Sequence, residues 1–474
     1  MAGERRSAGV GLTLLRAGGG GWSWSAGSGG GGLSRFESRM LSACELTGGI
    51  GRESGGVVDW LPAHGLLCCI GRVCGHLIHL RMDVDGHLVP VQHAEMPEEH
   101  ELTQRYVSVS VNHHYGWLQL QNPTPAFVEA ETDLDFSRLV EEGAEHDVDA
   151  LQQLAPDIRR EALPAPVMAA QVTEFIGGAG GIAVGVSLHH TAAGGRGLWR
   201  FLEMWAAAAA VAGSETAPVA VETASPLHDR RLVSFEGDEE LARVFLRQVA
   251  PDLPRTVPKQ DASSGPQNHQ LSRRTFTLSS PVIQRLKQQL AAAAGAAAPP
   301  STFIAVVAHG WVSIARASGF TDGAPVFAVF LADLRAHMSP RVPEAYAGNC
   351  LALCAVAMAG AELTGMDGTA RAWLAIRDAA AEVRRDPLAD RARWFSKFAD
   401  IPRGRAVIMA GSPWFPAYGV DFGFGRPVRA ELASMNHDGE MVLVAGREAG
   451  SVQSSVALAA DKMPAFRELF VIDT

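Results

Sequence analysis

One unit of the sequence constrains the fold more than any other: two strands, two histidines, a glycine-rich turn and a helix follow one another directly. Residues 168–188 consist of two apolar runs separated by the glycine-rich segment 177–181, which predicts a β-hairpin. His189 and His190 come at the end of its second strand. The segment 197–212 then predicts an amphipathic helix, with one face formed by Leu198, Phe201, Leu202 and Trp205.

A histidine at the end of a strand, beside glycines, is well placed to act as a general base. The backbone there is held by the sheet, and small neighbours let a substrate approach the ring. Most single histidines in proteins are surface or satisfied core groups, so the position alone does not decide the role of His190. Zinc binding by His189 and His190 together is disfavoured, because adjacent residues at a strand end point to opposite faces and no third ligand is evident. We expect no metal.

Strands and helices alternate in both halves of the chain, which predicts an α/β protein of two mixed-sheet and helix layered domains. Further strands are expected at 102–111, 127–130, 274–278, 326–331, 351–358 and 441–445. Further helices are expected at 133–140, 239–248, 281–293, 302–317, 369–384 and 463–470, and the segment 439–459 is expected to form a hairpin.

Composition shifts divide the chain into five parts. Residues 1–35 are rich in glycine and serine and are expected to be a disordered tail, whereas 36–96 show no clear period. Residues 97–225 form the expected N-terminal domain with the histidines. Residues 226–270 are a crossover segment, and 271–474 form the expected C-terminal domain.

The bulk properties exclude several partners. The formal net charge is −10, which argues against a nucleic-acid partner, since phosphate backbones require clustered lysine and arginine. No apolar run reaches the about 18 residues of a membrane span, so no membrane partner is expected. The six cysteines follow neither a zinc nor a disulfide spacing, which favours free thiols and a cytoplasmic protein.

A second candidate motif is Asp421-Phe422-Gly423-Phe424-Gly425. Two glycines around an aromatic residue indicate an unusual backbone, and an acid at its start can accept hydrogen bonds from nearby amides. A purely structural loop is the preferred interpretation of this pattern.

These motifs resemble those of the BAHD family of plant acyl-CoA-dependent acyltransferases. The segment 189–195, His-His-Thr-Ala-Ala-Gly-Gly, is similar to the family's His-x-x-x-Asp-Gly motif, and 421–425 is similar to Asp-Phe-Gly-Trp-Gly. The segment 330–335, Phe-Leu-Ala-Asp-Leu-Arg, also resembles a family sequence. Residues 346–350, Tyr-Ala-Gly-Asn-Cys, resemble the Tyr-Phe-Gly-Asn-Cys of the subgroup acting on flavonoid, anthocyanin and phenolic glucosides. The resemblance covers about 97–474; the family's first strand and helices are not recognisable in 1–96.

The resemblance implies a two-domain fold with a channel between the domains, entered by an acyl-CoA and by an alcohol or amine acceptor. His190 would be the general base for direct acyl transfer without an acyl-enzyme, with malonyl or hydroxycinnamoyl groups moving to a phenolic or flavonoid glucoside. Asp421 matches a residue that is sometimes counted as catalytic and is otherwise structural. Arg273 and Arg274 lie where the family often contacts CoA phosphates, although ordinary surface charge is an equal alternative. The family implies a monomer with no permanently bound cofactor, and acyl-CoA as co-substrate.

Gly194 departs from the family pattern, which has an aspartate there. That acid is thought to pair with an arginine of the second domain, for which Arg335 is the candidate here, and the substitution is expected to loosen the turn that carries His190. Ala347 stands in place of a phenylalanine and is expected to have a similar effect. Two alternatives therefore stay open: a degenerate, non-catalytic relative that at most binds ligand, and the same fold acting on another alcohol or amine.

Overall fold

The computed structural model describes the backbone of five strands before residue 126 and most of the chain from there to residue 472. The early strands are β1 (Val10–Ala17), β2 (Leu80–Met82), β3 (Leu88–Pro90), β4 (Tyr106–Val111) and β5 (His114–Gln119). Later gaps cover 157–167, 213–225, 250–270, 392–400 and single positions including 179, 189, 191, 390, 403, 434 and 436.

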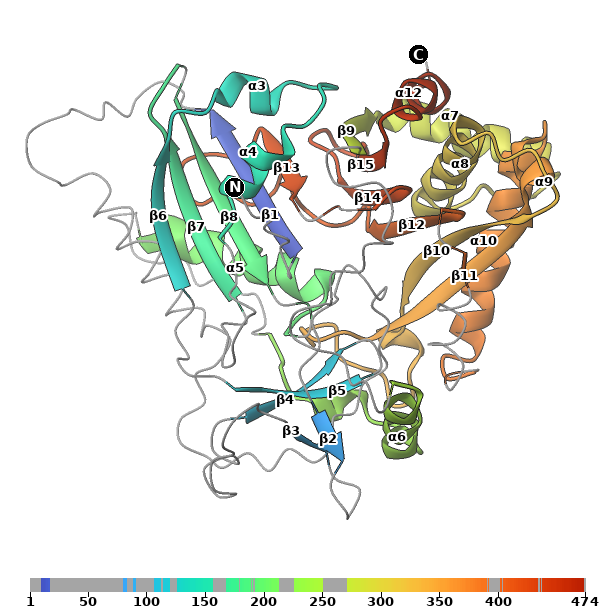
Figure 1. Ribbon diagram of the computed structural model, residues 1–474, viewed down its shortest axis with the longest axis horizontal. Coiled ribbons are helices and arrows are strands. Elements are labelled where there is room, and N and C mark those ends of the chain that lie inside the picture. The colour runs from blue at the N-terminus through green and yellow to red at the C-terminus, as the bar shows by residue number, and fades with distance from the viewer. Residues whose placement is uncertain are drawn as a thin grey trace, which may run out of the picture.

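A five-stranded sheet forms the first half of the molecule, with the strand order β13-β1-β8-β7-β6 (Figure 1). The strands β6 (Ala126–Thr132), β7 (Met168–Phe175) and β8 (Gly181–Leu188) follow the expected positions, and β7 and β8 form the predicted antiparallel hairpin. β8 is paired on both edges, with β1 and with β7, so the strand that leads to His190 is fixed on both sides.

Helices cover both faces of this sheet. α5 (Gly195–Ala212) packs Leu202 and Trp205, both fully buried, against apolar side chains of β7 and β8. The opposite face is covered by the short helices α3 (Phe136–Val140) and α4 (Val148–Gln153). The predicted pattern of strand, histidines, glycine-rich turn and helix is therefore present.

A six-stranded sheet forms the second half, with the order β11-β10-β12-β14-β15-β9. Its middle strands pair in parallel, and the outer pairs are antiparallel, so the sheet is mixed. The strands are β9 (Leu271–Leu278), β10 (Pro325–Asp333), β11 (Leu351–Ala359), β12 (Ala406–Gly411), β14 (Glu440–Ala445) and β15 (Val452–Ala459).

One face of the six-stranded sheet carries a layer of helices and the larger of the two main cores (Figure 1). α8 (Thr302–Ala317) lies at its centre, because nearly every side chain from Ile304 to Ala315 is buried. The helices of this layer are α7 (Ser280–Ala293), α8 (Thr302–Ala317), α9 (Gly360–Thr364), α10 (Gly368–Arg385) and α12 (Met463–Phe470). Together the two halves make the α/β, two-part layered fold that the sequence predicts.

One strand crosses between the halves. β13 (Arg429–Leu432) comes from the C-terminal part of the chain, yet it pairs with β1 at the edge of the five-stranded sheet. Leu432 of this strand also packs near Val442 and Ala457 of the six-stranded sheet. The expected boundary of a C-terminal domain at 271–474 therefore needs this correction, since four of its residues complete the other sheet.

The expectation of a disordered tail at 1–35 also needs correction, because residues 10–17 form β1 in the middle of the first sheet. The other residues of 1–35, and most of 36–96, lie outside the described part of the chain. The remaining elements are the hairpins β2–β3 and β4–β5, the helix α6 (Asp238–Val249) and the 3-10 turns η1 (Arg230–Val233) and η3 (Arg335–His337).

Within the described part of the chain, no helix is both long and apolar enough to span a membrane. Two of the six cysteines lie there, Cys350 and Cys354, and both are free thiols. Burial raises the pKa of each thiol to about 12, so neither forms the reactive thiolate near neutral pH.

Candidate active site

His190 lies in the turn between β8 and α5, which we call the His190 turn. β8 ends at Leu188 and α5 begins at Gly195, so the turn joins the central strand of the first sheet to the helix that packs on it. His190 itself is half-buried. A partly accessible ring at the end of a doubly paired strand fits the requirements of a general base.

Three hydrogen bonds from later segments of the chain fix the backbone of this turn. The Asn349 side-chain amide donates to the His190 carbonyl at 2.8 Å, and the Arg230 guanidinium donates to the Ala192 carbonyl at 3.3 Å. The Gly194 N–H donates to the Ala347 carbonyl at 3.0 Å. The turn is therefore held by the segment 346–350 and by η1 as well as by its own sheet.

Gly194 lies against Asn349. A β-carbon at position 194 would be 2.9 Å from Asn349 Oδ1 and 3.7 Å from the Gly348 carbonyl oxygen. The Gly348 oxygen accepts a hydrogen bond of 2.6 Å from Arg335 Nη2. Position 194 and Arg335 therefore both border the Gly348 carbonyl, and the pairing of an acid at 194 with Arg335 stays a prediction.

Arg335 has other partners in this chain. It is 3% exposed, its Nη1 donates to Asp333 at 2.9 Å, and its Nη2 also donates to the Tyr346 carbonyl at 3.1 Å. Its Nε has no hydrogen-bond partner among the described residues, and neither does Asn349 Oδ1. Asp333 also lies 3.4 Å from Arg196 of α5, so one carboxylate links this arginine to the helix that follows the His190 turn.

Asp421 organises the loop 421–425. Its Oδ1 accepts hydrogen bonds from the Gly423 N–H at 2.9 Å and the Gly425 N–H at 2.8 Å. Both glycines have positive φ angles, 93° and 103°, which side-chain-bearing residues rarely adopt. These contacts explain the Asp-x-Gly-x-Gly pattern as a loop-forming device, and a catalytic role for Asp421 stays a prediction.

The same loop supports α5. Phe422 is 6% exposed and contacts Trp205 of α5 edge to face, with ring centroids 5.0 Å apart. Phe415, a few residues earlier, lies 6.2 Å from Trp199, and a β-carbon at Gly195 would be 2.9 Å from its ring. The segment before and within the motif thus packs on the first turns of the helix that follows His190.

Arg273 and Arg274 lie side by side on β9, at the edge of the six-stranded sheet. Arg274 donates to the Gly143 carbonyl at 2.8 Å and lies 3.4 Å from Glu145, and its side chain is 23% exposed. Arg273 is 4% exposed, and burial lowers its pKa to about 10. The two predicted CoA contacts therefore differ: one is partly accessible and the other is enclosed.

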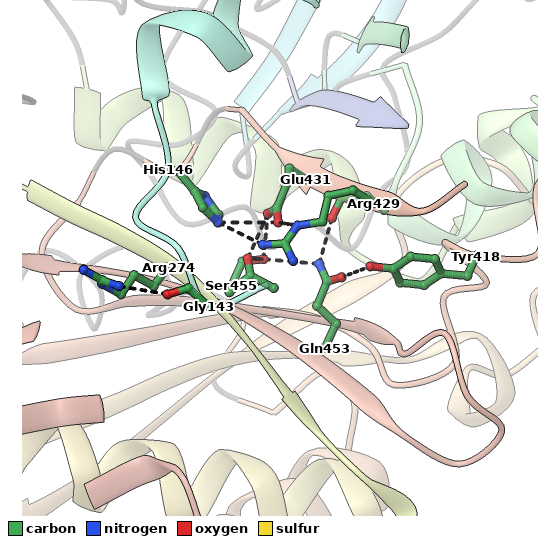
Figure 2. Close-up of polar contacts among 10 residues, drawn as sticks. Gly143, His146, Arg274, Tyr418, Arg429, Glu431, Gln453 and Ser455 are labelled. Atoms are coloured by element: carbon green, nitrogen blue, oxygen red, sulfur yellow. Dashed lines mark hydrogen bonds and ion pairs between the residues drawn. The ribbon is translucent and has the colours of Figure 1, made fainter. Parts of the chain in front are cut away.

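A buried polar network joins the halves next to these arginines, and Figure 2 shows Glu431 at its centre. Glu431 of β13 is 2% exposed and lies 2.5 Å from Arg429 Nε. Its other oxygen accepts from the Thr275 hydroxyl at 3.0 Å and the Ser455 hydroxyl at 3.1 Å. Buried ions of this kind require several partners, and here those partners come from β9, β13 and β15.

His146 completes the network from the first half of the molecule. Its Nε2 lies 3.5 Å from Glu431 and 3.3 Å from Arg429 (Figure 2). Burial lowers the pKa of His146, with further lowering from Arg429 and Arg273 and an opposing effect of Glu431. The imidazole is therefore held in its neutral form near neutral pH.

The predicted site residues do not form one constellation of contacts. His190 and the loop of Asp421 meet through α5. Arg273 and Arg274 lie beside the network around Glu431: the Arg273 carbonyl accepts from the His146 N–H at 2.8 Å, and Arg274 contacts Gly143 and Glu145. The sequence did not indicate the roles of Asn349 and His146. Asn349 lay within a recognised motif but had no assigned role, and nothing in the sequence around His146 distinguishes it. No group of three histidine, cysteine or acidic side chains in the described part of the chain could hold a metal ion.

Comparison with known proteins identifies the family. The sequence profile described as "Transferase family" matches residues 124–471. Phenolic glucoside malonyltransferase 1 of Arabidopsis thaliana is 26% identical over 351 residues, covering 70% of this chain and 72% of the relative. An anthocyanin 5-O-glucoside malonyltransferase of Salvia splendens is 27% identical, with 72% and 73% covered. Agmatine coumaroyltransferase of Arabidopsis thaliana is 25% identical, with 74% and 78% covered.

Solved structures share the fold. Vinorine synthase superposes with a TM-score of 0.59 at 16% identity, covering 96% of this chain and 88% of its own. TRI101 of F. sporotrichioides, complexed with coenzyme A and T-2, has a TM-score of 0.56 at 14% identity, with 97% and 93% covered. With the profile match over most of the chain, these likenesses show that the protein is an acyltransferase that belongs to the Transferase family, the BAHD family whose motifs its sequence resembles.

Proposed function

We propose that this acyltransferase moves a malonyl or hydroxycinnamoyl group from CoA to a hydroxyl of a phenolic or flavonoid glucoside, with His190 as the general base. The observation that carries the proposal is the placement of His190 in a backbone-fixed, half-buried turn at the end of the central strand β8. The names of the malonyltransferase relatives support the donor and acceptor class.

The proposed step needs only what one imidazole supplies. His190 accepts the proton of the acceptor hydroxyl while the oxygen attacks the thioester carbonyl carbon. The tetrahedral intermediate then breaks its carbon–sulfur bond, and the CoA thiolate takes a proton from the imidazolium. The products are an ester and free CoA, with no acyl-enzyme. General-base assistance of this type contributes about 10²–10⁴ in rate.

For the donor, Arg274 is the candidate cation for a CoA phosphate, because its side chain is partly exposed at the edge of β9. Arg273 was predicted with it. Its burial and its hydrogen bond to the Ala433 carbonyl favour a structural role over a direct contact with CoA. The co-substrate is acyl-CoA, as the CoA complexes of structural neighbours suggest.

The test measures free thiol released from malonyl-CoA and from coumaroyl-CoA in the presence of a phenolic glucoside. We expect wild-type turnover to exceed that of His190→Ala by about 10²-fold or more, because the variant lacks the base. His337→Ala serves as the matched control, since His337 is an exposed histidine of η3. Equal thiol release by wild type and His190→Ala would contradict the proposal.

An amine acceptor is the second candidate, and one observation favours it. Agmatine coumaroyltransferase is as similar to this chain as the malonyltransferases are, at 25% against 26–27% identity. The same assay with agmatine in place of the glucoside separates the two. Turnover with agmatine and none with the glucoside would move the assignment to an amide-forming enzyme of the same fold.

The non-catalytic alternative depends on Gly194. If the missing acid had released the His190 turn, the protein would bind CoA without transferring its acyl group. The three hydrogen bonds to the turn favour activity over this alternative. Acyl-CoA binding without thiol release from any acceptor would establish the non-catalytic reading.

A further inference from the structure

The Asn349 side chain reaches the backbone of His190 itself. It comes from the segment before β11, in the second half of the chain, and is 2% exposed. Its amide donates to the His190 carbonyl at 2.8 Å, in a place where water has little access to compete for that carbonyl. The bond therefore ties the general base of one half to the framework of the other.

The Asn349 amide and Gly194 fit each other. A β-carbon at 194 would lie 2.9 Å from Asn349 Oδ1, closer than real β-carbon contacts come. In this chain Gly194 adds no side chain to the space beside this amide, and the Asn349 contact holds a turn that lacks the family's acid.

We propose that Asn349 is a positioning residue, which fixes the His190 carbonyl and so the place of the imidazole, in a turn that lacks an acid at Gly194. The inference rests on the proposed function of His190. β8 fixes the chain up to Leu188, and the hydrogen bond from Gly194 to Ala347 fixes the other end of the turn. Asn349 holds the residue between these two points.

The position of a general base matters at the scale of this contact. A misplacement of about 1 Å can reduce a rate by about 10²-fold, because the base must lie within hydrogen-bond distance of the proton it removes. Loss of the Asn349 contact would let the carbonyl and the attached ring move. Binding of the two substrates elsewhere in the protein would be unaffected.

The experiment compares Asn349→Ala and Asn349→Leu with wild type. The leucine variant keeps a branched end of similar shape and has no donor, so it tests the hydrogen bond even if the alanine variant folds poorly. Gln171→Leu is the matched control: Gln171 is 7% exposed, lies on β7, and its amide donates to the Gln153 carbonyl at 2.7 Å. It removes an equivalent buried amide contact away from the turn.

Two readouts are measured on the full-length protein. Amide hydrogen exchange, followed by mass spectrometry of a peptide spanning 188–198, reports the Gly194 N–H and the His190 turn. Steady-state thiol release gives kcat and KM for acyl-CoA and acceptor. We expect faster exchange in this peptide and a kcat lower by about 10- to 100-fold with KM changed less than about 2-fold in both Asn349 variants. The Gln171 control should change neither readout.

Unchanged exchange in both Asn349 variants would overturn the proposal, and so would faster exchange with an unchanged kcat. A rise in KM equal to the loss of kcat/KM would also overturn it, since that pattern reports lost binding. If wild type released no more thiol than His190→Ala, the proposed function would fail. The exchange rates alone would then decide whether Asn349 fixes the turn.

Discussion

At the scale of single residues, Gly194 lies at the contact between the His190 turn and the second half of the molecule. The sequence shows the departure from the family acid and suggests Arg335 as the acid's partner, and that pairing stays a prediction. What the sequence could not reveal was the conformation of Asn349. That depends on the packing of two segments more than 150 positions apart, and no local pattern encodes it.

A pair of substitutions at Gly194 separates the effect of bulk from the effect of charge. Gly194→Ala adds a β-carbon 2.9 Å from Asn349 Oδ1, so we expect a loss of stability and a lower kcat as the amide is displaced. Gly194→Asp adds the same β-carbon and a carboxylate, which in the predicted pairing would accept a hydrogen bond from the unpaired Nε of the buried Arg335. The aspartate variant should therefore melt at a higher temperature than the alanine variant.

The measurement is thermal unfolding of wild type and both variants at one pH and ionic strength. Wild type provides the reference for the bulk effect, and the difference between the two variants gives the charge effect. An aspartate variant that melts at or below the temperature of the alanine variant would exclude the pairing with Arg335.

At the scale of elements, long segments with strong internal patterns were predictable and short or charged strands were not. The expected helices at 302–317 and 463–470 coincide with α8 and α12, because each carries an apolar pattern that needs no partner to be recognised. β13 was missed since its four residues, Arg-Ala-Glu-Leu, hold two charges, whose burial depends on pairing with each other and with polar groups of distant segments.

β1 shows a second kind of limit. Its surroundings in the sequence are rich in glycine, which favoured a disordered tail. Its place in the sheet comes from pairing with β8 and β13, which are far away in the chain. Strand formation depends on such neighbours more than on intrinsic preference, so composition alone gave the wrong result at 10–17.

The contact between α8 and α12 predicts a pH dependence of stability. His309 of α8 stacks on Phe470 at 5.1 Å, and its Nε2 lies 3.0 Å from the Phe470 carbonyl oxygen. Burial lowers the pKa of His309. Below about pH 6.5 the unfolded chain binds a proton that the folded ring resists, so stability falls as the pH falls, by at most about 1.4 kcal/mol per pH unit.

His309→Gln removes this titration and should reduce the drop in melting temperature between pH 7.5 and 5.5. His337→Gln is the control, since His337 is exposed. The drop should remain as in wild type for the control. A wild-type-sized drop in His309→Gln would show that His309 is not the source of the acid sensitivity.

At the scale of the whole molecule, two features join the sheets: a strand that crosses from one half to the other, and a set of buried charged side chains. β13 carries Glu431 and Arg429 into the junction, where β9, β15 and the loop of His146 surround them (Figure 2). The six-stranded sheet carries its helices on one face (Figure 1), and this junction adds polar links between the halves to those at the His190 turn. The fold class was predictable from the alternation of elements, but this network was not.

The network predicts a large difference between two conservative substitutions. Glu431→Gln keeps the shape of the side chain but leaves the Arg429 guanidinium, 4% exposed, without its carboxylate at the centre of the junction. Breaking a buried pair in this way should lower the free energy of unfolding by about 3–5 kcal/mol. Glu145→Gln breaks the ion pair between Glu145, whose side chain is 52% exposed, and Arg274, whose side chain is 23% exposed. This loss should lower the free energy of unfolding by less than about 1 kcal/mol. Denaturant unfolding of the two variants beside wild type measures both values, and equal losses would show that Glu431 does not hold the halves together through its charge.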